Sequence, residues 1–501
     1  MALRGPVRWL GWMTLVAVQT AVAQPPPPPA APATRPLNVV VLLADDLGWS
    51  DLGCYGADVH ETPALDRLAE QGVRFTQAYA MSVCSPTRAA LLTGQHAARL
   101  HLTVWRESSV ARDAEASRSQ RKLLPPATVW NVARERVTLA ESLKRAGYLT
   151  FHVGKWHLGD ADHSPETHGF DVNIGGTHWG APHSFFWPFR GEGRFGAEHR
   201  YVPGLGLGQP GEYLTDRLTD EAIQLIDVAG NRPFFLNLWF HSPHTPIQGK
   251  PEDVARFRPR IEPDSSHRNP DYAAMVYALD QNVGRILRHL DERGLAERTL
   301  VMFLSDNGGF IGTDRRSGQQ VPVTNNAPLR SGKGSLYEGG IRIPWIVRWP
   351  TVARAGARCD DPVVVMDLLP TIVSGTQVSR LVPDGDESAG DGPLDGRDIG
   401  PLLAEPSTAL PSRDLFFHYP HYYETTTPVS AIRSGAWKLL EYFEDGRREL
   451  YNLAEDPTES RDVSREHRQV ANDLYGRLAA WRNAVDAQLP SENPRVRLPV
   501  R

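Results

Sequence analysis

Four apolar runs, each followed at once by polar residues, constrain the fold of this chain most. They are residues 37–43 (LNVVVLL), 148–153 (YLTFHV), 234–240 (FFLNLWF) and 299–304 (TLVMFL). Such uninterrupted apolar runs are typical of strands that are buried on both faces of a parallel sheet. Helical patterns lie between them, at 64–71, 138–146, 214–228 and 271–292. This alternation predicts a doubly wound α/β domain with a mostly parallel sheet.

The residues after these runs are the types that build active sites. The first run ends in Asp45-Asp46, the second in GKWH, the third in HSPH and the fourth in SDNGG. Ligands of a doubly wound sheet bind outside the carboxyl ends of its strands. We therefore expect carboxylates, an amide, a lysine and histidines to meet at one edge of the sheet.

The adjacent carboxylates of Asp45 and Asp46 indicate a cation. At about 4 Å and an effective dielectric constant near 20, two such charges repel by roughly 4 kcal/mol. Asp306 and Asn307 would add two oxygen ligands from the fourth run. An all-oxygen set favours Ca²⁺, or less well Mg²⁺, over Zn²⁺. A lone Asp-Asp pair is more often a helix cap or a solvated loop. Here the SDN segment (residues 305–307) is expected at the same edge of the sheet, which favours a metal site.

Basic side chains follow the same strands. Lys155 and His157 lie in a turn flanked by glycines, and Lys333 also lies between two glycines. A lysine is a compact point charge that suits a tetrahedral anion. His244 and Lys333 are each candidates to protonate a leaving oxygen or to bind an anionic one.

Cys84 stands at the start of a predicted helix, because Pro86 suits a first turn and residues 87–93 continue it. The free N–H groups and the dipole of a helix N-terminus attract anions, and Arg88 adds a fixed positive charge. A buried structural cysteine and a Cys–His thiol nucleophile are the alternatives. Neither of them explains a carboxylate cluster suited to a metal.

The composition narrows the class of protein. A net charge of −5 offers no global field for nucleic acid, so we expect no nucleic-acid partner. The three cysteines (Cys54, Cys84 and Cys359) are an odd number, which leaves at least one thiol unpaired. A Cys54–Cys359 disulfide stays open on the sequence alone.

The chain begins with the pattern of an export signal. Arg4 and Arg8 precede an apolar run, and Ala21-Val22-Ala23 has the form of a cleavage site. We expect a signal peptide over residues 1–23 and a stiff proline-rich linker over 24–36. An N-terminal membrane anchor is the alternative, but the run is short for a span. The prediction is a periplasmic or secreted protein that has no membrane association after cleavage.

The pattern changes after residue 403. Short strands at 429–432, 437–443 and 449–453 flank a hairpin turn at Asp445-Gly446. A last helix carries one apolar face, made by Val470, Leu474, Leu478, Trp481 and Val485. We therefore expect a main catalytic domain over 37–403 and a smaller C-terminal α+β subdomain over 404–501.

Two segments carry a family resemblance. SVCSPTRAALLTG and GYLTFHVGKWH resemble the signature segments of the type I, formylglycine-dependent sulfatases, and Cys84 to Arg88 matches their C-x-P-x-R core. ADDLGWSDLGCYG, PHTP, LSDNGG and SGKGSLYEGGIRIPWIVRWP extend the match in family order, from Leu37 to about Asp462. HGFDVNIGGTHWGAP and GEYLTDRLTDEAI are similar to the branch of arylsulfatase A and N-acetylgalactosamine-6-sulfatase. The resemblance implies an alkaline-phosphatase-like fold and a sulfated carbohydrate substrate.

The resemblance also implies roles. A modification enzyme would convert Cys84 to Cα-formylglycine, whose hydrated form attacks sulfur, expels the alcohol and then ejects sulfate with His157 as base. It implies a Ca²⁺ ion held by Asp45, Asp46, residue 84, Asp306 and Asn307. Arg88, Lys155 and Lys333 would bind sulfate oxygens, and His244 with Lys333 would serve the leaving group.

The pocket walls and the rival functions are less defined. Residues 102–136 are expected to form a loop that borders the pocket, and the candidate wall residues are His101, Thr177, His178, Trp179 and His183. The nearest rival is a phosphonate or phosphate ester hydrolase on the same scaffold, because sulfate and phosphate are both tetrahedral anions. A non-catalytic glycan-binding protein is the other. Every polar position expected of an active site is filled, which favours an enzyme.

Overall fold

The computed structural model describes residues 36–107, 121–193, 198–314, 320–378 and 392–496, together with Met1, Ala2 and Gly5. The chain divides into two units, residues 1–35 and 36–501, and the described strands and helices all lie in the second unit. The predicted signal peptide and linker lie outside the described residues, apart from Met1, Ala2, Gly5 and Pro36. Within the described residues, no helix is long and apolar enough to cross a bilayer.

A nine-stranded sheet forms the centre of the second unit. The strand order is β11-β2-β10-β9-β1-β8-β4-β5, with β12 paired to β2. The strands are β1 (Asn38–Ala44), β2 (Val73–Tyr79), β4 (Leu149–Gly154), β5 (Val172–Ile174), β8 (Phe234–Trp239), β9 (Thr299–Ser305), β10 (Arg342–Arg348), β11 (Ala357–Cys359) and β12 (Val363–Val364).

The four predicted runs are β1, β4, β8 and β9, and they are neighbours at the middle of the sheet. They run parallel in register: Leu43 lies opposite Trp239 of β8 and Leu304 of β9. β10 is antiparallel to both of its neighbours, so the sheet is mixed but mostly parallel, as predicted. We did not predict β2 and β10; Pro344 lies at a break in the β10 register, between Ile343 and Trp345.

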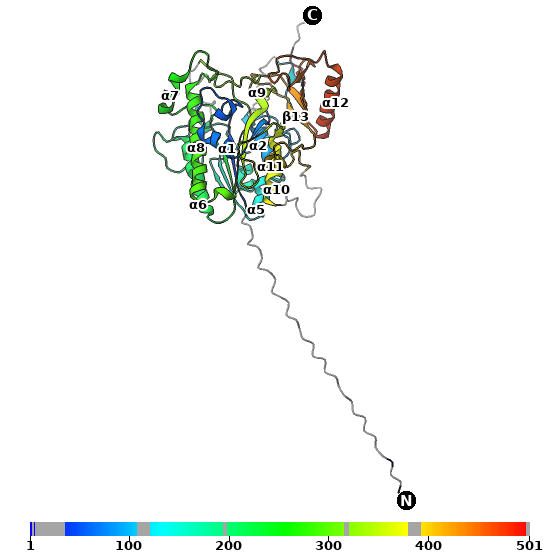
Figure 1. Cartoon of the computed structure of the whole chain (residues 1–501). Coiled ribbons are helices and arrows are strands. Elements are labelled where there is room, and N and C mark those ends of the chain that lie inside the picture. The colour runs from blue at the N-terminus through cyan, green and yellow to red at the C-terminus, as the bar shows by residue number, and fades with distance from the viewer. Residues whose placement is uncertain are drawn as a thin grey trace. The chain divides into compact units, whose positions relative to one another are not determined.

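Helices cover both faces of the sheet. Alternate residues of β1 enter two separate cores, Val41 with α2, α5, α10 and α11, and Leu42 with α1, α6 and α8 (Figure 1). The helices of the first group are α2 (Cys84–Thr93), α5 (Leu139–Arg145), α10 (Leu368–Thr376) and α11 (Gly400–Ala404). Those of the second are α1 (Pro63–Gln71), α6 (Leu214–Ala229) and α8 (Pro270–Glu292). The predicted doubly wound architecture is confirmed.

The C-terminal part is a four-stranded antiparallel sheet with one long helix. The strands are β13 (Asp414–Tyr419), β14 (Val429–Ser434), β15 (Trp437–Tyr442) and β16 (Arg448–Asn452), and the helix is α12 (Arg468–Ala484). One face packs Ile432 and Leu439 against Leu474 of α12. The other face packs Phe417 and Leu440 into the core beneath α2. The predicted antiparallel sheet and terminal helix are present, and β13 is an additional strand.

Short elements connect these layers. They are α7 (Pro251–Phe257), α9 (Glu338–Ile341), β3 (Leu123–Leu124) paired with β17 (Ser491–Glu492), and β6 (Gly191–Glu192) paired with β7 (His199–Arg200). Single 3₁₀ turns cover Gly53–Tyr55, Ala161–His163, Pro165–His168, Arg258–Arg260, Ala296–Arg298 and Val365–Asp367.

The disulfide left open by the sequence is not formed. Cys54, Cys84 and Cys359 are all free thiols. The stability of the described unit therefore rests on its packed cores rather than on a cross-link.

Candidate active site

The ends of four strands meet where the sequence places them. Hydrogen bonds between backbones hold them together: Asp45 N donates to Ser242 O (3.0 Å), Asp306 N to Ala44 O (3.1 Å) and Lys155 N to Trp239 O (2.8 Å). The segments after β1, β4, β8 and β9 are therefore tied to one another as well as to their strands. Side chains that are up to about 260 positions apart in the chain become neighbours.

The carboxylates and the amide form one buried cluster. Asp46 N donates to Asp306 Oδ1 (3.1 Å), and Asn307 Nδ2 donates to Asp46 Oδ1 (2.8 Å). Asp46 has a left-handed backbone (φ 63°), an uncommon conformation for a residue other than glycine. Asp45 Oδ1 and Asn307 Oδ1 are buried and receive no hydrogen bond. Two orphaned oxygens beside charged carboxylates are what an oxygen-ligated cation needs.

Each carboxylate also contacts a cationic side chain. Lys155 Nζ lies 2.7 Å from Asp45 Oδ2, Lys333 Nζ lies 2.7 Å from Asp46 Oδ1, and Arg88 Nη2 lies 2.7 Å from Asp306 Oδ2. Burial opposes ionisation of Asp46, but Lys333 and His244 outweigh it and hold its pKa well below the ordinary range.

Asp45 differs from Asp46. Burial raises the pKa of Asp45 well above the ordinary range, in spite of the nearby Lys155. Arg88 Nη2 lies 3.7 Å from Asp45 Oδ1, so the arginine compensates the charge of this carboxylate only weakly. The cations present thus leave one buried carboxylate undercompensated, and a bound metal ion would stabilise its ionised form.

Cys84 is the first residue of α2 and is buried. Its Sγ lies 3.4 Å from His157 Nδ1. Burial raises the pKa of the Cys84 thiol, but Lys155, His157 and Lys333 outweigh it and lower the pKa to about 6. The surroundings of this side chain are therefore strongly electropositive, and they suit a group that carries or develops negative charge.

His157 is fixed by contacts on both sides of its ring. Its Nε2 lies 2.7 Å from Glu107 Oε2, and its backbone N donates to Thr177 O (2.9 Å). Glu107 accepts a further hydrogen bond from Gly180 N (3.0 Å). Burial lowers the pKa of His157, but Glu107 and Cys84 outweigh it and raise the pKa above its ordinary value.

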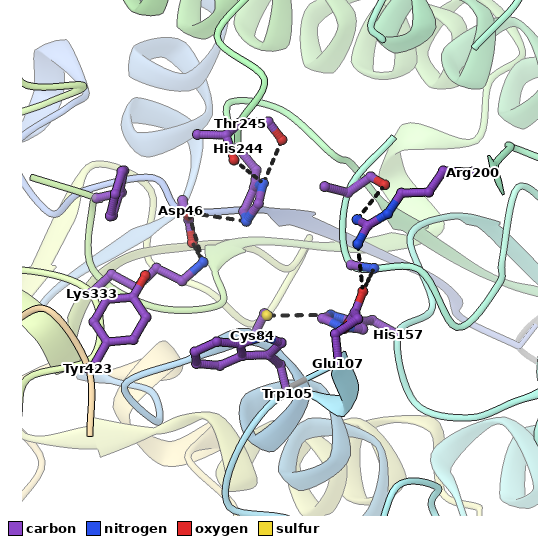
Figure 2. A pocket seen from close by; sticks show the side chains of 13 residues that line it. Asp46, Cys84, Trp105, Glu107, His157, Arg200, His244, Thr245, Lys333 and Tyr423 are labelled. Atoms are coloured by element: carbon purple, nitrogen blue, oxygen red, sulfur yellow. Dashed lines mark hydrogen bonds and ion pairs between the residues drawn. The ribbon is translucent and has the colours of Figure 1, made fainter. Parts of the chain in front are cut away.

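Figure 2 shows the side chains that line a cavity around Cys84. The cavity has a volume of about 210 Å³. Five predicted residues line it: Asp46, Cys84, His157, His244 and Lys333. The other lining residues are Trp105, Glu107, Gly180, Ala181, Arg200, Thr245, Phe310 and Tyr423. Burial lowers the pKa of His244 to about 3 although Asp46 Oδ2 is 3.5 Å from its Nε2, so this ring is neutral at physiological pH.

The other predicted polar residues lie behind the cavity wall. Asp45, Arg88, Lys155, Asp306 and Asn307 are buried and do not line the cavity. The Arg88 side chain is fully enclosed, and besides Asp306 it donates to Lys155 O (3.2 Å). Arg88 therefore holds the carboxylates of Asp306 and Asp45 together and does not contact the cavity.

The five expected wall residues do not line the cavity. His101 Nε2 lies 2.9 Å from Asp486 O, close to the end of α12. Thr177 contributes its carbonyl to His157, while His178 and Trp179 pack on each other and Trp179 stacks under Arg200 (5.0 Å). His183 packs against Gly191. The segment reaches the cavity through Gly180 and Ala181, because a tight turn points the larger side chains away.

Several lining residues were missed. Trp105 and Glu107 lie in the stretch that was expected to border the pocket, but nothing in a mixed polar run singles out one glutamate. Arg200 comes from β7 and Tyr423 from the C-terminal part, so only the folded chain brings them to Cys84. Trp105 and Tyr423 meet edge to face, with ring centroids 5.5 Å apart.

A mostly parallel sheet with a carboxylate cluster at its carboxyl ends agrees with the architecture of an alkaline-phosphatase-like hydrolase. The sequence profile of the family described as Sulfatase matches residues 37–378, and that described as N-sulphoglucosamine sulphohydrolase, C-terminal, matches 332–484. The first match covers more than half of the chain. The chain belongs to the sulfatase family, and it is a sulfatase of type I.

Named proteins of similar sequence are also sulfatases. A Sulfatase of Formosa agariphila is 32% identical, over 90% of this chain and 89% of its own. N-acetylgalactosamine-6-sulfatase of Canis lupus familiaris is 32% identical (81% and 72% covered), and human arylsulfatase A is 31% identical (82% and 76% covered). A crystal structure of Ps i-CgsB in complex with k-i-k-neocarrahexaose is 30% identical, with a TM-score of 0.71, over 91% of this chain and 94% of that one. The predicted branch is supported.

Proposed function

We propose that this sulfatase removes sulfate from a carbohydrate ester, with a Cα-formylglycine made from Cys84 by a modification enzyme and with a bound Ca²⁺ ion. The observation that carries the proposal is the position of Cys84. Its Sγ faces His157 Nδ1 at 3.4 Å in a cavity that Asp46 and Lys333 also line. A nucleophile, a base, a metal-type carboxylate and a cation thus share one small space.

The ligand set supports Ca²⁺. Asp45, Asp46, Asp306 and Asn307 offer only oxygens for a metal, and two of these oxygens, on Asp45 and Asn307, are buried without a hydrogen-bond partner. Such a set suits Ca²⁺, whereas Mg²⁺ demands a stricter octahedral geometry and keeps several waters. When bound, the ion supplies positive charge that polarises a sulfate oxygen.

The residues around position 84 have separate tasks. The hydrated formylglycine supplies an oxygen nucleophile and a second hydroxyl through which sulfate is released. His157 Nδ1 faces this position and takes its proton, while Glu107 holds the ring in that orientation. Lys333 keeps its proton, because Asp46 outweighs the effect of burial and raises the lysine pKa well above its ordinary value. Lys333 therefore presents a positive charge to the sulfate, and His244 beside it faces the leaving oxygen.

The shape of the cavity supports a sugar. Its volume of about 210 Å³ is that of a small molecular fragment, and Trp105, Tyr423 and Phe310 supply apolar ring surface. Aromatic rings offer flat apolar faces on which the C–H face of a pyranose packs. The bound neocarrahexaose of the similar solved protein agrees with a sulfated carbohydrate.

The same proposal covers location and domain layout. The signal pattern of residues 1–23 supports a mature chain in the periplasm or outside the cell. Residues 37–403 form the catalytic domain and 404–501 the smaller subdomain, which contributes Tyr423 to the cavity.

The test compares two cysteine variants of the full chain that is produced with the modification enzyme. Cys84→Ala should lower turnover of 4-nitrophenyl sulfate by about 10³-fold or more, because the nucleophile is lost. Cys54→Ala, the matched control at a thiol outside the cavity, should keep normal turnover. Equal activity of Cys84→Ala and the parent contradicts the mechanism. Faster turnover of bis(4-nitrophenyl) phosphate than of the sulfate favours the phosphoesterase instead.

A further inference from the structure

A second group of buried polar side chains lies outside the candidate active site. Asp51 follows β1, His60 precedes α1, and His267 precedes α8. Their exposed fractions are 0%, 6% and 3%. One donor atom of each lies within 4.8 Å of the other two, and the two imidazole rings are 4.3 Å apart.

The distances between these donor atoms are close to those between the ligand atoms of a tetrahedral metal ion. His267 Nε2 lies 3.1 Å from Asp51 Oδ1, and His60 Nδ1 lies 3.8 Å from the same oxygen. Bonds of about 2.0 Å from a tetrahedral Zn²⁺ place neighbouring ligand atoms about 3.3 Å apart. His267 Nε2 is buried and, despite its short distance to Asp51, makes no hydrogen bond of suitable direction. This nitrogen therefore faces Asp51 Oδ1 inside the cluster as an ion-pair partner, without a hydrogen bond.

Neighbours orient two of the three side chains. His267 Nδ1 lies 2.5 Å from Asp58 Oδ1, and this use of the second ring nitrogen by a carboxylate is how metal-binding histidines are held. Asp51 Oδ2 accepts hydrogen bonds from Gly48 N and Tyr272 Oη, both at 2.6 Å. Its Oδ1 is left facing the two rings, with Thr324 Oγ1 at 2.7 Å as its other partner.

We propose that Asp51, His60 and His267 bind a divalent transition-metal ion, with Zn²⁺ preferred. Two imidazole nitrogens and one carboxylate form a borderline set that suits Zn²⁺ and does not suit Ca²⁺ or Mg²⁺. In this structure His60 Nδ1 donates a hydrogen bond to Asp51 O (2.9 Å), and a metal ion bound at Nδ1 would replace that proton. A water molecule would take the fourth position. Asp58 is a positioning residue, because it touches the metal only through His267.

The site is structural, and it supports the loop that carries Asp46. Tyr272 Oη lies 2.6 Å from Asp51 Oδ2 and 3.1 Å from Asp46 O. An ion that fixes Asp51 therefore also fixes the turn in which Asp46 takes its left-handed backbone. None of the three ligands lines the cavity around Cys84.

A proton is the competitor of the metal. Burial lowers the pKa of His267, but its contacts with Asp51 and Asp58 outweigh burial and raise the pKa to about 9. In the absence of a metal, an imidazolium ion therefore joins the two carboxylates. A metal ion must displace that proton in order to bind.

The test uses Co²⁺ as the probe, on the full chain saturated with Ca²⁺. We expect one equivalent of bound Co²⁺ with the visible absorption of a tetrahedral site. Asp46→Asn should keep this absorption, because Asp46 belongs to the other cluster. Asp58→Asn should weaken Co²⁺ binding about 10–100-fold while the ligands stay in place.

His60→Gln removes a ligand, and His163→Gln, at a histidine outside the cluster, is its control. We expect the absorption to be lost in the first and kept in the second, and Zn²⁺ to raise the melting temperature of the parent but not of His60→Gln. If His60→Gln does not fold, Asp58→Asn decides the question. Absent Co²⁺ binding by the parent, or equal binding by the parent and Asp58→Asn, would overturn the proposal. None of these readouts depends on sulfatase activity.

Discussion

Glu107 determines which side of the His157 ring carries the proton. Its Oε2 lies 2.7 Å from Nε2, so in the neutral ring the Nε2–H donates to Glu107 and Nδ1 faces Cys84 with a lone pair. Gly180 N and Arg200 hold the other carboxylate oxygen, at 3.0 and 3.6 Å. The arrangement is the usual one for a histidine base, with a carboxylate behind it.

Glu107→Gln therefore tests the role of His157. Loss of the negative charge removes the larger of the two charge effects, those of Glu107 and Cys84, that raise the His157 pKa, so that pKa falls. If neutral His157 is the base, the acidic limb of the kcat/KM profile for 4-nitrophenyl sulfate should move to lower pH. The kcat value should fall about tenfold or more, with little change in KM.

Glu198→Gln is the matched control. Glu198 lies 3.1 Å from Arg200 but does not touch His157. Its profile should coincide with that of the parent. An unshifted acidic limb in Glu107→Gln would show that His157 is not the titrating base.

The sequence was most informative about residues that sit next to strands. Asp45, Lys155 and Asp306 each stand two residues after the end of an apolar run, so the edge they share was predictable. Glu107 and Arg200 belong to irregular segments, and their meeting with His157 depends on contacts between distant parts of the chain. No local pattern encodes such contacts.

At the scale of elements, the turn after β4 places two functional residues. Gly154 ends β4 with a φ of 98°, and a Cβ atom there would lie 2.0 Å from Trp239 O of β8. The close approach of the two strands lets Lys155 N donate to that same oxygen at 2.8 Å. A glycine at this position is thus required by both backbone conformation and space.

Gly154→Ala should destabilise the protein by about 2 kcal/mol or more, because strain and a clash with backbone add together. It should also lower kcat for 4-nitrophenyl sulfate, since Lys155 and His157 move. Gly147→Ala is the matched control, with a φ of 87° and open space around its Cβ position. It should cost about 1 kcal/mol and leave kcat unchanged. Equal losses of unfolding free energy in urea would contradict the clash.

Element types were predictable where periodicity was strong. The central strands are uniformly apolar because both faces are covered, and α8 carries a long apolar stripe beneath its Asn269 cap. The sequence did not predict β10, because Pro344 breaks the strand pattern. It did not predict β2, because the charged and polar positions of that strand resemble a loop. These two segments become strands because β10 pairs with β9 and β2 pairs with β11.

At the scale of the whole described unit, a buried ion network joins the two sheets. Lys438 of β15 has a fully buried side chain, and its Nζ lies 2.9 Å from Glu338 Oε1 and 2.8 Å from Glu459 Oε1. Glu338 belongs to α9, five residues after Lys333 in the chain. The network therefore connects the C-terminal sheet to the segment that carries a cavity residue.

Lys438→Met should cost about 3–5 kcal/mol of unfolding free energy, because it leaves the buried carboxylate of Glu459 without its cation and leaves Glu338 with only the arginine Arg342, at 3.5 Å. Lys144→Met is the control. Lys144 forms an ion pair with Asp171 (2.8 Å), but its side chain is 44% exposed, so its loss should change stability by less than about 1 kcal/mol. Urea unfolding measures both, and similar small losses would show that the network is not stabilising.

Buried histidines predict that acid weakens the fold. Burial lowers the pKa of His418 to about 3, whereas an unfolded histidine titrates near 6.5. The unfolded chain therefore binds one more proton below pH 6.5. The contribution of His418 to stability is fully present above that pH and is lost as the pH falls toward 3.

His418→Asn should remove about one proton from the proton uptake on unfolding between pH 6 and pH 4, or roughly 1.4 kcal/mol per pH unit of slope. Urea unfolding at several pH values gives that slope. His289→Asn is the control, at a partly buried histidine that pairs with the exposed Asp227. An unchanged slope in His418→Asn would mean that this ring is already protonated in the folded chain.

The chemistry proposed at position 84 can be read directly by mass spectrometry. The peptide that contains Cys84 is isolated from enzyme that turns over 4-nitrophenyl sulfate, and an aldehyde-reactive probe is applied to it. We expect the mass of formylglycine and labelling at residue 84, with the Cys54 and Cys359 peptides unlabelled. An intact thiol at position 84 in fully active enzyme would contradict the account.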